Sequence, residues 1–465
     1  MLAAAAATRG CIEPLARAAL VPVHRFDIRF KRENERGFAR RGVCGCALRE
    51  LILPSLDSPR VVRLPARIPP LAITAYTATC AAARGLDALS DAVRERRSGL
   101  RQNDLAEHPL PCFIGRVAGL EETQLPAAFA HHDARNNRLA WLGLNQDGFL
   151  DTARALRDRY GADRVALVLG TSTSSIGETE AAYRHLDADG RFAPEQRRAV
   201  HQPHSLGLFV QDVLGLDGPC LSIATACSSS AKVFASAERL LRAGIVDAAI
   251  VGGVDTLCGS VLYGFNSLAL VAPQACRPFD IARCGLSLGE AAGFAILERA
   301  GGTNAHVDKS TPCLVGYGES SDAHHMSAPH PQGLGAQIAV EDALARAGIG
   351  PADVDYINLH GTATPQNDAV EAALIARLFA ATTLASSTKG WTGHTLGAAG
   401  IVEAVIALLA IEHGLVPGTL NARELDPACG PQIRIDNSAS SVRVALSNSF
   451  GFGGNNCCLA FAAAA

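Results

Sequence analysis

Lysine is nearly absent from this 465-residue chain, which contains only Lys31, Lys232, Lys309 and Lys389. Arginine supplies almost all of the basic charge, and 42 basic against 45 acidic residues leave a net charge of −3. A balance this close to zero creates no overall field that would attract nucleic acid or an anionic membrane. The composition therefore excludes binding driven by net charge, and a charged partner would have to be met by a local patch of arginines.

Cysteine pairs at metal-binding spacing are missing as well. The 14 cysteines are scattered, no CxxC pair occurs, and Cys44-x-Cys46 lacks the second pair that a zinc site needs. The alanine run at residues 3–7 is followed too soon by Arg9 and Glu13 to be a secretory signal. We expect no metal site and no disulfides, and mostly buried thiols in a reducing cytoplasm.

Long apolar runs are the third absence. The best stretch, Ala404 to Ile411, is bounded by Glu403 and Glu412 and is too short to cross a bilayer. With 48% hydrophobic residues, 44 glycines and only 19% charged residues, the chain has the composition of a large and well-buried α/β protein. We expect a core helix at residues 404–411 and no membrane span.

Strand and helix patterns alternate from about Leu71 to the C-terminus, which favours parallel, buried sheets covered by helices. Residues 1–70 hold many arginines but little periodicity, so we expect them to be a poorly ordered extension. A break near residues 301–311 divides the rest into an N-terminal half, 71–305, and a C-terminal half, 306–465. Apolar runs predict strands at 165–169, 248–251, 295–297 and 354–359, and periodicity predicts helices at 145–160 and 335–347.

A cysteine on a strand-to-helix turn carries the first chemical signal. Cys227 lies between a predicted strand, 221–224, and a predicted helix, 228–242, which Gly244 is placed to cap. Unpaired amides at a helix N-terminus favour a thiolate, so we expect the pKa of the thiol to be lowered and Cys227 to be a nucleophile. Its position alone also leaves open a buried structural cysteine.

Two histidines occupy loops that follow predicted strands. His360 ends the strand 354–359 and opens a His-Gly-Thr loop, at the sheet edge where α/β proteins place their chemistry. His394 closes the segment 389–394, Lys-Gly-Trp-Thr-Gly-His, and a helix is predicted from about Leu396. Neither has the HxxxH spacing or acidic neighbours of a metal ligand, and each taken singly could be a structural histidine.

The last motif is a glycine-rich hairpin at residues 447–456, between predicted strands 442–446 and 457–461. Free amides in such a hairpin can form half of an oxyanion hole. Asn456 stands where a GxGxxG dinucleotide fingerprint needs glycine, which excludes that interpretation.

Together these segments resemble the β-ketoacyl-acyl carrier protein synthases of the elongating type I and type II class, which are condensing enzymes of the thiolase superfamily. The resemblance extends from about Leu71 to the C-terminus and leaves only the extension uncovered. It rests on six segments in the family order: Thr225 to Ser229, Arg277 to Asp280 with Gly289-Glu290, Ser321 to Met326, His360 to Thr362, Lys389 to His394, and the glycine-rich hairpin.

The resemblance implies a thiolase fold, in which two similar βαβ-rich halves form a five-layered αβαβα sandwich, and a homodimer. It also implies a decarboxylative Claisen condensation: Cys227 carries the acyl chain, and malonyl-acyl carrier protein supplies two carbons. His360 and His394 would stabilise the enolate or assist decarboxylation. No cofactor is implied beyond the phosphopantetheine of the carrier protein.

The resemblance also implies roles for the surrounding residues. Lys389 would order the histidines electrostatically, and Glu371 would support the site from behind. The amides of Cys227 and Phe452 would form the oxyanion hole, and the Phe452 ring would be the gate between the two half-reactions. Thr362 and Thr364 would hold the pantetheine arm.

Two other functions remain open on the sequence. A non-catalytic partner subunit of the chain-length-factor kind would usually carry glutamine in place of Cys227, and a cysteine hydrolase of the papain type would need a CGxCW pattern that is missing here. Fatty-acid synthesis and a specialised polyketide or aryl polyene route would use the same residues. The short stretch between Leu297 and Val315 favours the specialised route slightly. The acyl chain, the carrier protein and the choice between homodimer and heterodimer stay open.

We predict that residues 1–65 are dispensable, because they lack the periodicity needed to bury a face and precede the family resemblance. A truncation that starts near Arg60 should keep the melting temperature and the condensing activity of the full chain. An insoluble or inactive truncated protein would show that the extension packs on the rest of the chain.

Overall fold

An eleven-stranded sheet organises the residues described by this computed structural model, 66–192, 198–301 and 311–463. Its order is β12-β11-β15-β16-β10-β1-β9-β7-β5-β6, with β2 (Ala83–Arg84) paired to β1 off this path. Residues 1–65 of the predicted extension, 1–70, lie outside the described residues. The strands of the first half are β1 (Leu71–Cys80), β5 (Val165–Gly170), β6 (Cys220–Ile223), β7 (Ala248–Asp255) and β9 (Ala291–Arg299). Those of the second half are β10 (Cys313–Ser321), β11 (Tyr356–Asn358), β12 (Leu384–Ser386), β15 (Val444–Gly451) and β16 (Asn455–Ala462).

The same strand order occurs twice in this sheet. When the strands of each half are numbered along the chain, their order across the sheet is third, second, fourth, fifth, first in both halves. The strand directions repeat too. In each half the third, second and fourth strands run parallel to one another, whereas the fourth pairs antiparallel with the fifth and the fifth antiparallel with the first. Within the described part of this sheet, β1 and β10 join the two halves through the pairs Leu71–Leu314 and Ala72–Cys313. The predicted boundary at 305/306 falls in residues 302–310, outside the description, so that division remains a prediction.

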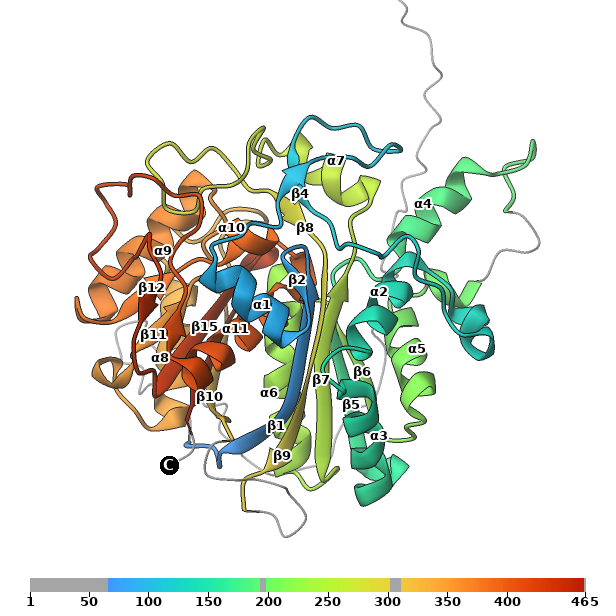
Figure 1. Ribbon diagram of the computed structural model, residues 1–465, viewed down its shortest axis with the longest axis horizontal. Helices are drawn as coiled ribbons and strands as arrows, with labels where there is room; N and C mark the ends of the chain where they lie inside the picture. The colour runs from blue at the N-terminus through green and yellow to red at the C-terminus, as the bar shows by residue number, and fades with distance from the viewer. Residues whose placement is uncertain (1–65, 193–197, 302–310, 464–465) are drawn as a thin grey trace, which may run out of the picture. The chain divides into compact units, whose positions relative to one another are not determined.

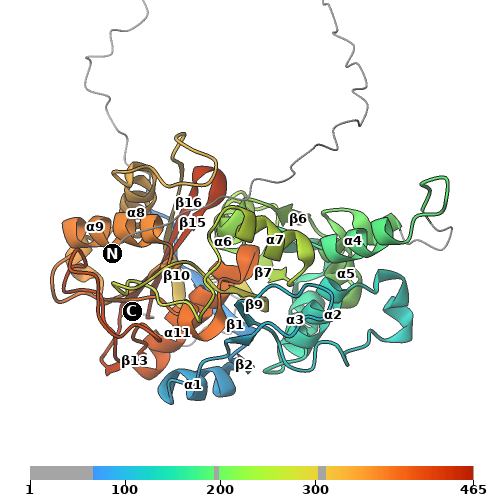
Figure 2. The ribbon, with the colours of Figure 1, turned by 90° about the horizontal axis from the view of Figure 1, so that it is seen from above.

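Helices form three layers, one between the two half-sheets and one on the outer face of each, as the resemblance to the thiolase fold implies (Figures 1 and 2). One apolar core lies under α2, α3 and α5, and another lies under α8 and α9. The largest core surrounds α6 and α11, which lie between the half-sheets. The helices are α1 (Leu86–Arg94), α2 (Arg135–Leu144), α3 (Phe149–Tyr160), α4 (Ile176–Arg184), α5 (Ser205–Leu214), α6 (Ser229–Arg242), α7 (Gly259–Ser267), α8 (Leu334–Ala347), α9 (Pro365–Leu378), α10 (Lys389–Thr392) and α11 (Ala399–His413).

The central helix α11 is apolar on every side because other elements surround it. All residues from Ala399 to Ala410 are buried. The apolar helical stretch is longer than the predicted 404–411: Leu396–His413 is long and apolar enough to cross a membrane, but 83% of it is buried inside the protein. The expectation of a core helix at this place is confirmed.

Several predicted elements differ in their bounds. The strands predicted at 248–251 and 295–297 are longer, as β7 and β9, and β15 and β16 extend into the predicted hairpin 447–456. The predicted helix 145–160 begins only at Phe149, because Asn145 ends α2 and Asp147 and Gly148 adopt positive φ angles in the turn between the two helices. The predicted strand 354–359 is limited to β11, Tyr356–Asn358. The eleven described cysteines are free thiols, as expected.

Candidate active site

Cys227 lies in the tight turn between β6 and α6, as the sequence predicts. The 3-10 turn Ala226–Ser228 precedes α6, and Ala226 adopts a φ of 51°, which places the Cys227 side chain in the interior at 5% exposure. Gly451 packs against this turn, where a Cβ would lie 2.9 Å from the Thr225 carbonyl oxygen and 3.2 Å from the Cys227 nitrogen. The hairpin therefore needs glycine here to approach the cysteine.

The fold brings Cys227, His360 and His394 together from three distant segments. His394 Nε2 lies 2.9 Å from Cys227 Sγ, and one ligand atom from each of the three side chains lies within 4.8 Å of the others. The two imidazole rings are perpendicular, with centroids 5.4 Å apart. The thiol therefore faces two imidazoles, and His394 is the one in direct contact.

Backbone hydrogen bonds fix His394 against β8 (Leu288–Gly289). The His394 amide donates to the Ser287 carbonyl at 2.7 Å, and the Gly289 amide donates to the His394 carbonyl at 2.9 Å. Glu290 follows β8 directly, is fully buried, and accepts hydrogen bonds from the amides of Val117 and Leu257.

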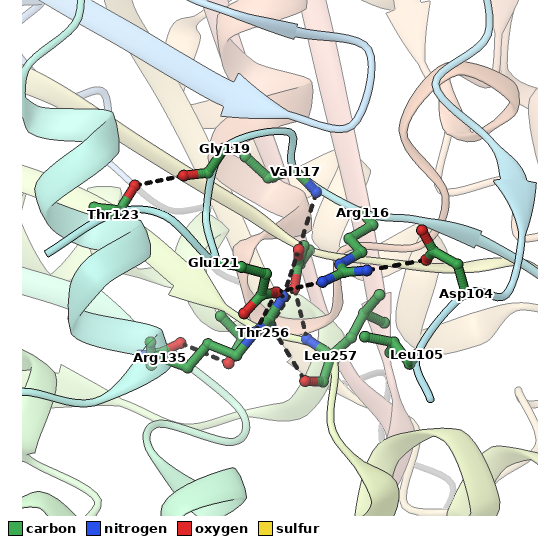
Figure 3. A network of polar contacts seen from close by, with 12 residues as sticks. Asp104, Leu105, Arg116, Val117, Gly119, Glu121, Thr123, Arg135, Thr256 and Leu257 are labelled. Carbon is green, nitrogen blue, oxygen red and sulfur yellow. Dashed lines mark hydrogen bonds and ion pairs between the residues drawn. The ribbon is translucent and has the colours of Figure 1, made fainter. Parts of the chain in front are cut away.

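Glu290 also contacts Arg135, which belongs to a polar network with Glu121, Arg116 and Asp104 (Figure 3) that ends at exposed side chains. Arg135 Nη1 contacts Glu290 at 2.5 Å, and its Nη2 contacts Glu121 at 2.8 Å. Arg116 joins the same Glu121 to Asp104. Glu290 belongs to a motif that the sequence analysis singled out, and this network explains how a buried carboxylate there is neutralised while it anchors β8 next to His394.

Both histidines are held in the neutral form. Burial lowers the pKa of His360 and of His394 well below the usual value, and the positive charge of Lys389 lowers both further. The Nδ1 atoms of both rings have no hydrogen-bond partner among the described residues. A neutral imidazole carries one N–H donor and one acceptor, so each ring can donate to a developing negative charge or accept a proton.

The expected lowering of the Cys227 pKa is wrong. Burial raises the pKa of the thiol from 9.0 to about 11, and the opposing effects of the Phe452 amide and of Lys389 are smaller. Sequence reasoning considered the positive end of α6 but could not weigh it against complete removal of the sulfur from water. The resting cysteine is therefore a thiol, and its proton faces the neutral His394.

Lys389 is buried beside a carboxylate that the sequence analysis did not single out. Its Nζ contacts the His360 carbonyl oxygen and Glu403 Oε1. Burial raises the pKa of Glu403 to about 7, and Lys389 acts against this shift. The sequence offered one signal for this carboxylate, since Glu403 is an acidic residue within the apolar sequence of α11. Its partner Lys389 is known only from the fold.

Glu371 supports His360 from α9. Its carboxylate oxygens accept the amides of His360 at 2.9 Å and Gly361 at 2.8 Å, and Asn448 Nδ2 donates to it at 3.2 Å. These bonds hold the loop that carries His360, which is the position that the resemblance implied for Glu371.

A cavity of about 630 Å³ opens onto the three side chains. Thr362 and Thr364 line it, with their hydroxyls 2.9 Å apart. The backbone of Phe452 acts to lower the pKa of Cys227, and the Phe452 ring stacks on Phe265 of α7 with centroids 5.4 Å apart. The sequence analysis missed Phe265, because only packing reveals that its ring also lies edge-on to His394, 6.4 Å away.

Two family models match the chain. They are the beta-ketoacyl synthase N-terminal domain, over residues 69–301, and the beta-ketoacyl synthase C-terminal domain, over residues 312–423. Together the two matches cover well over half of the chain.

Curated relatives and solved structures agree with these matches. Nodulation protein E of Rhizobium meliloti is 36% identical over 74% of this chain and 83% of that protein. The mitochondrial 3-oxoacyl-[acyl-carrier-protein] synthase of Arabidopsis thaliana is 42% identical over 53% of this chain and 57% of its own. The ketosynthase ApeO from Xenorhabdus doucetiae, solved in complex with its chain length factor ApeC, is 35% identical with a TM-score of 0.75 over 85% of this chain and 98% of that chain.

We predict from the buried thiol that the alkylation rate of Cys227 by iodoacetamide keeps rising with pH. A raised pKa means that the reactive thiolate becomes more populated as the pH increases towards about 11. Peptide-resolved mass spectrometry between about pH 6 and 10, with a free cysteine peptide (pKa about 8.5) as reference, measures this. A rate that reaches its plateau below about pH 8 would contradict the raised pKa.

Proposed function

The chain belongs to the β-ketoacyl synthase family and is a condensing acyltransferase, and we propose that Cys227, His360 and His394 carry out its reaction. The reaction joins an acyl chain bound to Cys227 with the two-carbon unit of a malonyl-acyl carrier protein and releases a 3-oxoacyl-acyl carrier protein. The observation that supports this assignment most is the contact of His394 Nε2 with Cys227 Sγ, at 2.9 Å, inside a cavity that His360 also lines.

In the first half-reaction, Cys227 attacks the thioester of the acyl carrier protein. His394 Nε2 accepts the thiol proton, which the raised pKa of the thiol makes necessary. The amides of Cys227 and Phe452 hold the oxyanion of the tetrahedral intermediate. The intermediate collapses with cleavage of the carrier's carbon–sulfur bond, the released thiolate takes the proton back from His394, and the acyl group remains on Cys227.

In the second half-reaction, the malonyl group loses its carboxylate as carbon dioxide, and the electron pair of the broken bond forms an enolate. The N–H group of His360 donates to the enolate oxygen, and His394 donates to it as well in the neutral tautomer that carries the proton on Nε2. The enolate carbon then attacks the acyl-Cys227 carbonyl, the cysteine sulfur leaves as a thiolate, and a proton from solvent restores the resting thiol. Lys389 contributes by keeping both rings neutral, since its charge opposes their protonation.

The remaining cavity residues suit a pantetheine-linked substrate. The hydroxyls of Thr362 and Thr364 line the cavity and can bond the amides of the arm. We assign the Phe452 ring as the gate, because it stacks on Phe265 directly beside the thiol and has to move aside for a bulky acyl group.

We favour a specialised route over primary fatty-acid elongation. The chain covers 83% of nodulation protein E and 98% of the ketosynthase ApeO, but only 57% of the mitochondrial synthase. Because ApeO was solved with a chain length factor, a related but non-identical partner is a candidate beside a homodimer. A chain-length-factor role for this chain itself is disfavoured, since the cysteine and both histidines are assembled around one cavity.

The proposed chemistry uses side chains and thioesters alone, so the carrier's phosphopantetheine is the only prosthetic group that it calls for. The free thiols of the described residues suit a reducing compartment such as the cytoplasm.

We predict that Cys227→Ala abolishes condensation because it removes the acyl acceptor, and that the fold is kept. Mass spectrometry of wild-type protein incubated with acyl-carrier protein should find the acyl group on Cys227. Cys284→Ala, which removes an exposed cysteine, is the matched control and should keep full activity. Turnover by the Cys227 variant, or an adduct on another cysteine, would refute the assignment.

We predict that the two histidines separate in their effects. His360→Ala should lower carbon dioxide release by about 10²–10³-fold, the cost of losing one oxyanion donor, and should largely spare acylation of Cys227. His394→Ala should slow both steps, because His394, unlike His360, has its Nε2 at 2.9 Å from the sulfur. Each variant is loaded with labelled acyl-carrier protein, and acylation and carbon dioxide release are measured separately. Equal loss of both steps in His360→Ala would show that His360 also serves the thiol.

A further inference from the structure

Two adjacent histidines and an aspartate converge on the outer layer of the first half, away from the active site. His131 and His132 end the 3-10 helix Ala127–His132, just before α2, and Asp212 lies near the end of α5. His132 Nε2 is 3.3 Å from Asp212 Oδ2, and His131 Nε2 is 3.6 Å from the same oxygen. One ligand atom from each residue lies within 4.8 Å of the other two.

These separations suit a shared metal ion better than direct hydrogen bonds. A charge-assisted N–H···O bond is typically about 2.7–2.9 Å long, shorter than either contact here. Two ligand atoms bound to a tetrahedral ion at about 2.0–2.1 Å are about 3.3–3.4 Å apart, close to both observed distances. The two rings lie with centroids only 4.1 Å apart, an arrangement that repulsion would oppose if both were protonated.

The buried ligand is held in place by its surroundings. His132 is 8% exposed, its ring packs edge-on against Phe209 with centroids 5.7 Å apart, and its carbonyl accepts Asn137 Nδ2 at 2.8 Å. Phe209 and Asp212 lie one turn apart on α5, so the helix that packs the ring also presents the carboxylate.

The other two ligands face solvent. The side chains of His131 and Asp212 are 62% and 48% exposed, which leaves an open position for a water molecule as fourth ligand. Two imidazoles and one carboxylate suit zinc, copper and nickel, whereas magnesium and calcium prefer oxygen ligands throughout.

We propose that His131, His132 and Asp212 form a binding site for a divalent transition-metal ion, for which Zn²⁺ fits the tetrahedral spacing best. The bound ion links the segment before α2 to α5, two neighbouring elements of the outer helix layer (Figure 1). Sequence spacing could not indicate this site, because three helices (α2, α3 and α4) and the strand β5 separate the histidines from α5, which carries the aspartate.

The test is a titration of the full chain with Zn²⁺, and with Co²⁺ as a coloured substitute. Cys227 is first alkylated with iodoacetamide, because Cys227, His360 and His394 also place three donors within 4.8 Å of one another. We expect one ion per chain, a rise in melting temperature, and a visible absorption band of four-coordinate Co²⁺ without the thiolate charge-transfer band that binding at Cys227 would add.

His131→Gln and Asp212→Asn should each weaken Zn²⁺ binding by at least about 10-fold and remove the metal-dependent rise in melting temperature. Both replace exposed side chains, so their melting temperature without metal should stay unchanged, and so should condensing activity. His185→Gln, which removes an exposed histidine of another segment, is the matched control and should bind normally. If Zn²⁺ binding does not saturate up to about 1 mM, or if both variants bind Zn²⁺ as tightly as the unsubstituted chain, the proposal is overturned and only a histidine–aspartate ion pair is left.

Discussion

The close approach of α6 and α11 at Ala231 and Gly400 is the contact on which the active site depends. A Cβ at Gly400 would lie 2.6 Å from the Ala231 nitrogen, so only glycine permits this distance. The Ile401 amide donates to Ser230 Oγ at 2.9 Å and ties the first turns of the two helices together. Because the thiol precedes α6 and His394 precedes α11, this helix contact sets the distance between the sulfur and the imidazole.

The two halves reach this point by the same local structure. Ala226 and Leu396 each begin a 3-10 turn before a central helix, and each has a positive φ, 51° and 58°. A non-glycine residue in this conformation costs about 1–3 kcal/mol and is typical of functional sites. The repeated sheet order therefore brings the starts of α6 and α11 together. The halves differ in the side chain that precedes the helix, which is Cys227 before α6 and His394 before α11.

The buried charges of Lys389 and Glu403 matter more for the protonation of the site than for the stability of the fold. A buried ion pair such as Lys389–Glu403 adds little net stability, because removing both groups from water costs about as much as their attraction returns. Its effect on the histidines is clearer, since burial lowers their pKa values and the lysine charge lowers them further, while burial raises the pKa of the thiol. The site thus rests with a protonated sulfur and neutral rings, and charge develops only during the reaction.

The sequence by itself determined the type and order of the elements, the Cys227 turn, both histidine loops and the glycine-rich hairpin, because each depends on local patterns of polarity, glycine and helix starts. It also carried the family assignment, which the comparisons confirm. Only the tertiary structure decided which distant groups meet: Glu403 beside Lys389, Phe265 against Phe452, and His131 and His132 beside Asp212. It also reversed the expected shift of the Cys227 pKa, since the helix end is a local feature but burial is the sum of everything that packs around the sulfur.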